Sequence, residues 1–114
     1  SYYLHMRYLF AVIDNKHRES GEAPGEMLAI DAFNDKLEAA GQRILAVGLS
    51  SPSTGMVFDN RQGDKIQKQG PLIESDDFMA GMWILKIDTQ EEVYKLAEEA
   101  SRVCNRRIEV RAIL

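Results

Sequence analysis

The alternation of apolar and polar side chains along the chain predicts six strands and two helices. Three strands are apolar at both parities, so both of their faces need cover; they span residues 7–14, 43–49 and 82–88. Two segments repeat apolar residues at helical spacing, residues 26–40 and a helix that begins at Thr89. Residues 55–59 and 65–69 form a hairpin, and a last strand spans residues 108–113. The order is β-α-β-β-β-β-α-β.

Local signals place the ends of these elements. Gly41 stands where a left-handed residue closes the first helix. Thr89 and Glu92 have the spacing of a capping box, in which each side chain would bond to the other residue's backbone N–H. Residues 65–69 carry two lysines, which indicates an exposed edge strand, and residues 72–80 are expected to be irregular. The buried stripe of the first helix is expected to contain Met27, Ile30, Phe33, Leu37 and Ala40.

This order of elements predicts a ferredoxin-like α+β sandwich, because two right-handed crossovers place both helices on the same side of one sheet. Two helices cover only one face, whereas three of the strands are apolar on both faces. An apolar patch of more than roughly 400 Å² is unusual on a soluble monomer. We therefore expect a homodimer that forms through the open sheet faces.

Composition narrows the function classes. The chain has 114 residues, 45% hydrophobic and 28% charged, which fits one globular domain, and its net charge of −4 argues against nucleic-acid binding. No apolar run approaches the roughly 18 residues of a membrane span, and no signal peptide is recognisable, so we expect a cytoplasmic protein without a membrane partner. The single cysteine excludes a zinc site with several thiolates, and we expect no metal and no cofactor. Residues 1–5 are interpreted as a vector scar and residues 6–114 as the domain.

The run Gly70-Pro71-Leu72-Ile73-Glu74-Ser75, followed by Gly81-Met82-Trp83, resembles the Asp-Gly-Pro-Phe-x-Glu-Thr signature of DGPF-domain proteins, within the YCII-related superfamily. Three further segments match: Phe33-Asn34-x-x-Leu37-x-x-Ala40-Gly41, Gly48-Leu49-x-x-Pro52 and Glu109-Val110-Arg111. The resemblance spans almost all of residues 6–113 and implies a dimeric α+β barrel. The sequence departs from the family where Gln69 replaces the signature's Asp and Leu72 its Phe. Met27 lies on the helix where some relatives carry the histidine of a proposed catalytic His–Asp pair.

Five residues are candidates for a site. Glu74 is the best remaining acid or base, although a carboxylate after a turn also caps backbone N–H groups. Asn34 lies beside the apolar stripe of the first helix, where its amide either bonds a neighbouring loop or orients a ligand. Asp31 is a solvated helix carboxylate or a ligand contact, and Trp83 either packs in the core or dimer interface or stacks on a planar ligand. Arg111 could bind an anion.

Two further residues have reactive side chains. His17 lies in a polar loop, where both Asp14 and Glu19 are open as partners, and surface exposure is its plainer interpretation. Cys104 lies near Arg102, Arg106 and Arg107, and we expect a buried, inert thiol because no histidine or second cysteine is available to complete a mechanism. The arginines themselves complement the dipole at the end of the second helix.

Three functions follow from these residues. The first is a ligand-binding module with a cleft beside the first helix and the Gly70-Pro71 loop, whose partner is a small molecule. The second is a cofactor-free lyase or hydrolase, similar to a dehydrochlorinase, that acts on a small acid, aromatic or chlorinated, with Glu74 as base, Asn34 orienting and Arg111 binding the anion. The third is a cofactor-free barrel monooxygenase.

Overall fold

The computed structural model describes residues 6–18 and 24–114; the predicted vector scar and Glu19 lie outside the described residues. The elements follow the predicted order, and a short 3-10 helix at Pro52–Thr54 is added to them. They are β1 (Arg7–Asn15), α1 (Glu26–Ala39), β2 (Arg43–Gly48), β3 (Met56–Asp59), β4 (Ile66–Gln69), β5 (Asp77–Lys86), α2 (Gln90–Cys104) and β6 (Arg107–Ala112).

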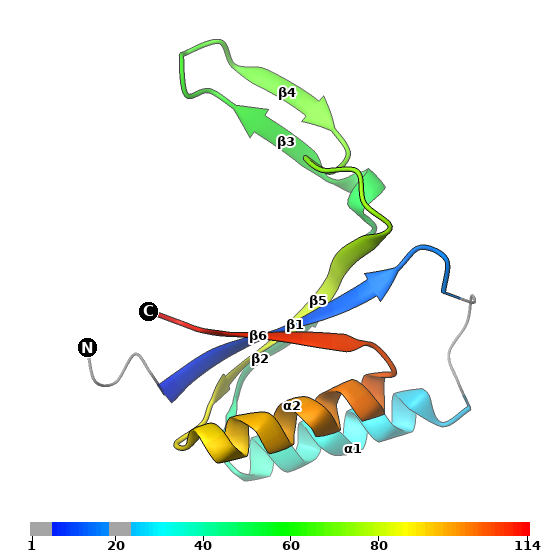
Figure 1. Cartoon of the computed structure of the whole chain (residues 1–114), viewed down its shortest axis with the longest axis vertical. Coiled ribbons are helices and arrows are strands. Elements are labelled where there is room, and N and C mark those ends of the chain that lie inside the picture. Colours follow the sequence, from blue (N-terminus) through cyan, green and yellow to red (C-terminus); the bar gives the residue numbers. More distant parts are fainter. Residues whose placement is uncertain (1–5, 19–23) are drawn as a thin grey trace.

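Four strands form one antiparallel sheet in the order β2-β5-β1-β6, which is the ferredoxin-like arrangement. Both helices lie on the same side of this sheet, and the β3–β4 hairpin projects on the other side (Figure 1). The hairpin is a separate two-stranded sheet, so β4 has a partner on one side only, as expected for an edge strand. The predicted ferredoxin-like α+β fold is confirmed.

The core lies between the helices and the inner face of the sheet. Phe10, Leu37 and Leu85 are completely buried there, and the rings of Phe33 and Trp83 meet edge to face with their centroids 5.5 Å apart. The predicted stripe of α1 is wrong at its two ends, where Met27 is 50% exposed and Ala40 is exposed.

The extent of β5 differs from the prediction. The strand begins at Asp77, inside the stretch expected to be irregular, because it continues to pair with β1 through a bulge between Val12 and Ile13. Gly81 follows this bulge at a point where β2 comes very close. A Cβ atom on Gly81 would lie 2.7 Å from the carbonyl oxygen of Val47, so only glycine fits without a shift of the backbone.

The predicted helix caps form only in part. Thr89 caps α2, since its Oγ1 accepts from the backbone N–H of Glu92 at 3.2 Å. The Glu92 carboxylate does not complete the box and instead accepts from Gln42 Nε2 at 2.8 Å, which ties α2 to the residue before β2. Gly41 has φ +70° after α1, as expected for a left-handed closing residue.

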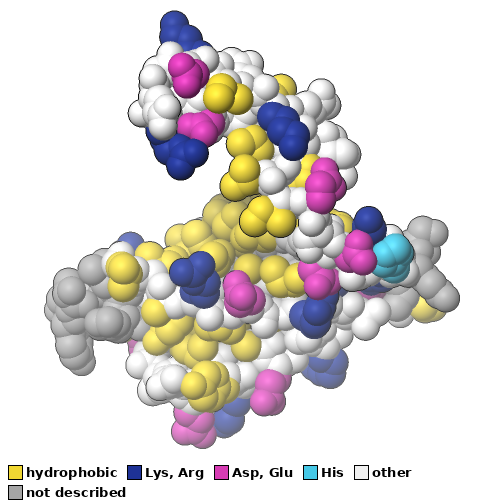
Figure 2. Space-filling model, turned by 45° about the horizontal axis from the view of Figure 1, so that its top comes forward, with side chains coloured by type: hydrophobic (Ala, Val, Ile, Leu, Met, Phe, Trp, Pro, Cys, Tyr) yellow, Lys and Arg dark blue, Asp and Glu magenta, His cyan; other side chains and the backbone are white. Residues whose placement is uncertain are grey.

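The face of the sheet opposite the helices carries apolar side chains. Strand register places five of them side by side, with Leu9 and Leu45 on either side of Ile84, and Val47 beside Met82. Leu45 is 39% and Val47 40% exposed. Figure 2 shows apolar side chains gathered on the surface below the hairpin. The sequence predicts that two helices leave one apolar face of the sheet uncovered, and this is so in the single chain.

Candidate functional site

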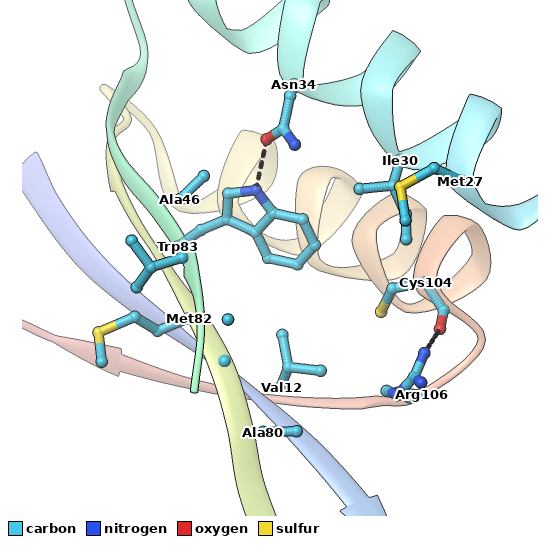
Figure 3. A pocket seen from close by; sticks show the side chains of 13 residues that line it. Val12, Met27, Ile30, Asn34, Ala46, Ala80, Met82, Trp83, Cys104 and Arg106 are labelled. Atoms are coloured by element: carbon cyan, nitrogen blue, oxygen red, sulfur yellow. Dashed lines mark hydrogen bonds between the residues drawn. The ribbon is translucent and has the colours of Figure 1, made fainter. Parts of the chain in front are cut away.

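A cavity of about 350 Å³ lies between α1 and the inner face of the sheet (Figure 3). Its lining comes from α1, β1, β2, β5 and the junction between α2 and β6. The lining residues are Val12, Met27, Ile30, Asn34, Ala46, Val47, Gly48, Ala80, Gly81, Met82, Trp83, Cys104 and Arg106. Its volume is at the lower end of the roughly 300–1,000 Å³ of small-molecule sites, so the cavity suits a compact ligand.

Asn34 and Trp83 form a polar contact on the cavity wall. The indole Nε1–H of Trp83 donates to Oδ1 of Asn34 at 2.7 Å. The partner of the half-buried amide is therefore an indole, and not the neighbouring loop that the sequence suggested. This bond fixes the orientation of the amide, because Oδ1 must face the indole. Figure 3 shows that the nitrogen of the same amide points away from Trp83. The Asn34 amide can therefore donate to a bound molecule.

Arg106 lies at the opposite end of the cavity. The chain reverses there because Asn105, in the left-handed conformation with φ 51°, ends α2. Ser101 then holds the reversed chain: its carbonyl oxygen accepts from Arg106 N at 3.3 Å, and its Oγ donates to the Arg106 carbonyl oxygen at 2.6 Å. The guanidinium also bonds to the backbone, because Nη1 donates to the Cys104 carbonyl oxygen at 2.7 Å. Arg106 is thus held by local backbone geometry.

Arg106 and three further charged side chains form a cluster, and we call Asp14, Arg18, Glu26 and Arg106 the ion quartet. Arg106 donates through Nε to Asp14 Oδ2 at 3.1 Å and through Nη1 to Glu26 Oε2 at 3.4 Å. Arg18 Nη2 donates to the other Glu26 oxygen at 3.2 Å. The Glu26 side chain is 3% exposed, which two guanidinium partners make tolerable.

Hydrogen bonds and neighbouring charges keep Asp14 and Arg106 ionised. Burial raises the pKa of Asp14, but the hydrogen bonds from Asn15 N–H and Arg106 and the charges of Arg106 and Arg18 outweigh it, and the pKa lies below its ordinary value. Burial lowers the pKa of Arg106, whereas its bonds to Asp14 and the two carboxylate charges raise it, with a net increase. Asp14 and Arg106 therefore form an ion pair at neutral pH.

Cys104 lines the cavity but is not activated. Burial raises the pKa of its thiol, and this effect exceeds the opposing effects of the Arg106 backbone N–H and guanidinium charge. The thiol is protonated at neutral pH, in agreement with the expectation of an inert cysteine. Within residues 6–18 and 24–114, no three His, Cys, Asp or Glu side chains come together as a possible metal site.

The other predicted site residues lie elsewhere. Glu74 lines a second hollow, of about 480 Å³, together with Lys16, Ser51 and the Gly70-Pro71 turn. Arg111 pairs with Leu9 and lies on the open face of the sheet, and Asp31 is exposed on α1. The hypothesis of one cleft shared by α1 and the Gly70-Pro71 loop is therefore wrong for the single chain: Asn34 and Trp83 share the cavity, whereas Glu74 and Arg111 do not line it.

His17 has a partner that the sequence did not suggest. Its Nε2 lies 3.2 Å from Oδ2 of Asp76, and Lys16 Nζ contacts the other oxygen of the same carboxylate at 3.0 Å. The imidazole is 70% exposed. Of the two partners left open, Asp14 bonds to Arg106 instead, and Glu19 lies outside the described residues. This pair joins the end of β1 to the start of β5.

Two residues of the site, Glu26 and Arg106, were missed as a pair. Glu26 looked like an ordinary first-turn carboxylate, and Arg106 like one of three arginines near a helix end. A signal does exist, because Asp14 ends a strand that is otherwise apolar, and a carboxylate in that position needs a cation nearby. The separation of 92 residues between Asp14 and Arg106 hides the match in the sequence.

The fold and the cavity define a class, a ferredoxin-like α+β domain with a compact, largely apolar cavity between its first helix and the sheet. Within this class, the chain belongs to the YCII-related domain family, whose model matches residues 6–114. This match confirms the family indicated by the Gly70-Pro71 run and the segments around it. A comparison with curated proteins finds no match. Neither of the two helices in the described part of the chain is long and apolar enough to cross a membrane.

Proposed function

We propose that this protein is a binding module for a compact, largely apolar small molecule, which it holds in the cavity below α1. The observation that carries the proposal is the cavity itself, about 350 Å³ in volume, with Met27, Ile30 and Trp83 among its lining residues. Polar donors at two ends, the Asn34 amide and the Arg106 guanidinium, would orient the ligand. This combination of apolar walls and few polar groups is typical of small-molecule sites.

Binding is favoured over catalysis because of what lines the cavity. Among the described lining residues there is no carboxylate and no imidazole, and the Cys104 thiol is protonated at neutral pH. A general base and an activated nucleophile are therefore both missing from the lining. The alternative, a lyase or hydrolase with Glu74 as base, would have to use the second hollow. There Glu74 lies with Lys16 and Ser51, so loss of a measured turnover in Glu74→Gln would support that alternative.

The test uses the single tryptophan of the chain. Trp83 gives one indole N–H signal in a ¹H–¹⁵N spectrum, and that hydrogen is bonded to Asn34 on the cavity wall. Titration with a panel of small aromatic and aliphatic compounds should shift this signal in a saturable way. Ala80→Leu, which adds volume to the lining, should abolish the shift. The matched control is Ala32→Leu, at an exposed position of α1, which should bind as the wild type does.

A failure of this test has a clear form. If every compound leaves the indole signal in place, or if Ala80→Leu binds as tightly as Ala32→Leu, the cavity is not the binding site. Turnover of any compound that binds, with loss of turnover but not of affinity in Glu74→Gln, would instead make the protein an enzyme.

We also propose that the protein acts as a homodimer, in which a second copy covers the open sheet face. Leu45 and Val47 are about two-fifths exposed on that face, and the projecting hairpin exposes Met56 and Phe58, the latter at 66%. The radius of gyration is 16.3 Å, against about 13 Å for a compact chain of this length, because the hairpin extends from the domain. A partner held between the sheet face and the hairpin would bury apolar side chains of both.

Sedimentation velocity at micromolar concentration tests this assembly. We expect twice the mass of the 12.9 kDa chain. Leu45→Arg, on the open face, and Phe58→Ser, on the hairpin, should weaken the dimer, whereas Leu28→Arg at an exposed position of α1 should leave it intact. A monomeric wild type would contradict the proposal, as would a Leu45→Arg variant that dimerises like the control.

A further inference from the structure

The cavity offers a ligand hydrogen-bond donors at both polar ends. Asn34 uses Oδ1 for the Trp83 indole, which leaves the two hydrogens of Nδ2 to donate. Arg106 uses Nε for Asp14 and Nη1 for Glu26 and the Cys104 carbonyl oxygen. Among the described residues, no hydrogen bond involves Arg106 Nη2, so this nitrogen is the part of the guanidinium left to donate. A matching ligand therefore brings acceptors.

The charge around Arg106 decides which kind of acceptor fits. The two carboxylates of the ion quartet, Asp14 and Glu26, offset the two guanidinium groups, Arg18 and Arg106, so the quartet has no net charge. The next cation along the chain, Arg107, is itself bonded to Asp77. A carboxylate ligand would place a further negative charge beside Asp14 and Glu26 in a partly buried site, where an uncompensated charge is costly.

We propose that the cavity selects a neutral carbonyl compound over the carboxylate of the same shape, because the ion quartet presents donors without a net positive charge. This inference rests on the proposed function, since it assumes that the cavity holds a ligand. It also differs from the lyase or hydrolase alternative drawn from the sequence, in which Arg111 binds a compact acid. Arg111 lies on the open face of the sheet and does not line the cavity.

Benzamide and benzoate are the probes, because they share a ring and a planar head group and differ in charge. Both are titrated at pH 7.5 against the full chain, with the Trp83 indole signal as the readout. We expect benzamide to bind the wild type about tenfold more tightly than benzoate, which corresponds to about 1.4 kcal/mol. Glu26→Gln removes one negative charge and leaves the quartet with a net charge of +1, so it should shift the ratio toward benzoate by about tenfold.

Two further variants separate the effect of charge from a folding defect and from a change at an unrelated carboxylate. Asp14→Asn makes the same change of charge at a different residue and should shift the ratio in the same direction, so a folding defect in one variant does not end the test. Glu38→Gln is the matched control, since Glu38 is exposed on α1 and bonds to Arg43; its ratio should equal that of the wild type. Folding of each variant is checked by its ¹H–¹⁵N spectrum.

The outcomes separate the inference from the proposed function. If benzoate binds the wild type as tightly as benzamide or more tightly, and Ala80→Leu blocks both, the selection of a neutral ligand is wrong and the cavity is still the binding site. If the ratio in Glu26→Gln and Asp14→Asn equals that in Glu38→Gln, the quartet does not set the selectivity. If neither probe shifts the Trp83 signal, the proposed function fails for these probes and the inference falls with it.

Discussion

Replacement of Arg106 by methionine is the most direct test of what holds the cavity end together. The change keeps most of the aliphatic stem but removes the guanidinium, which donates to Asp14, Glu26 and the Cys104 carbonyl oxygen. Arg18 then remains as the only described cation bonded to either carboxylate, and it contacts Glu26 alone. Asp14 is left with the Asn15 N–H as its described hydrogen-bond partner.

The expected cost is large for a single substitution. Removal of one partner from a buried ion pair costs roughly 3–5 kcal/mol, and the lower end applies because the Arg106 and Asp14 side chains are 19% and 17% exposed. We therefore expect the free energy of unfolding to fall by about 3 kcal/mol. With a urea dependence of about 1.5 kcal/mol per molar, the midpoint should fall by about 2 M. Urea unfolding at pH 7, followed by far-UV circular dichroism at one fixed protein concentration, measures this shift.

Arg61→Met is the matched control for this measurement. Arg61 also pairs with a carboxylate, Asp59, but its side chain is 87% exposed on the hairpin, and such surface pairs contribute little to stability. The reasoning is refuted if Arg106→Met lowers the midpoint no more than Arg61→Met does. Acidification adds a second check. The Arg106 pair lowers the pKa of Asp14 in the wild type, so protonation of Asp14 removes this advantage, and the deficit of Arg106→Met should shrink as the pH falls.

Three further outcomes follow from single contacts. Gly81→Ala places a Cβ atom 2.7 Å from the Val47 carbonyl oxygen and should lower the free energy of unfolding in urea by more than about 2 kcal/mol. Gly48→Ala, whose Cβ would have no atom within 4 Å, should change that free energy by no more than about 0.5 kcal/mol. Equal losses in the two variants would contradict the close approach of β2 and β5. Thr89→Ala should cost about 1 kcal/mol by loss of the α2 cap, and Thr89→Asn should restore most of it; a neutral Thr89→Ala would show that the cap adds nothing. Asp14→Asn should be less stable than the wild type at neutral pH. Because folding lowers the pKa of Asp14, the wild-type advantage should be complete above the unfolded carboxyl pKa of about 3.9 and should vanish as the pH falls through the lower folded pKa. A stability difference that is constant with pH would refute the ionic role of Asp14.

The sequence predicts the fold well because its strongest signals are local. The helical spacing of Phe33 and Leu37, the cap at Thr89 and the left-handed Gly41 each act within a few residues, and the structure contains all three. The start of β5 could not be predicted in the same way. Residues 77–81 pair with the end of β1 across a bulge, and that pairing depends on contacts more than 60 positions apart in the chain.

The sequence predicts a site residue only where its near neighbours in the chain make it stand out. Asn34 stood out as an amide beside an apolar stripe, and it does line the cavity. Glu74 stood out through the Gly70-Pro71 run, but this run forms the rim of a different hollow. Arg106 and Glu26 carry no local signal, because each is an ordinary helix-end charge until the fold brings them within 3.4 Å of each other.

The two faces of the sheet separate the two proposed roles of the domain. Tyr8, Phe10 and Val12 alternate with Leu9 and Ile13 along β1, so neighbouring residues belong to opposite faces. The inner face holds the cavity with Val12 in its lining, and the outer face is the proposed dimer surface. Yet β1 also ends in Asp14, which anchors Arg106, and in Asn15, which bonds to Asp77 at the start of β5. A second copy that fixes the position of β1 from outside would therefore also fix the carboxylate that holds the cavity-lining guanidinium inside.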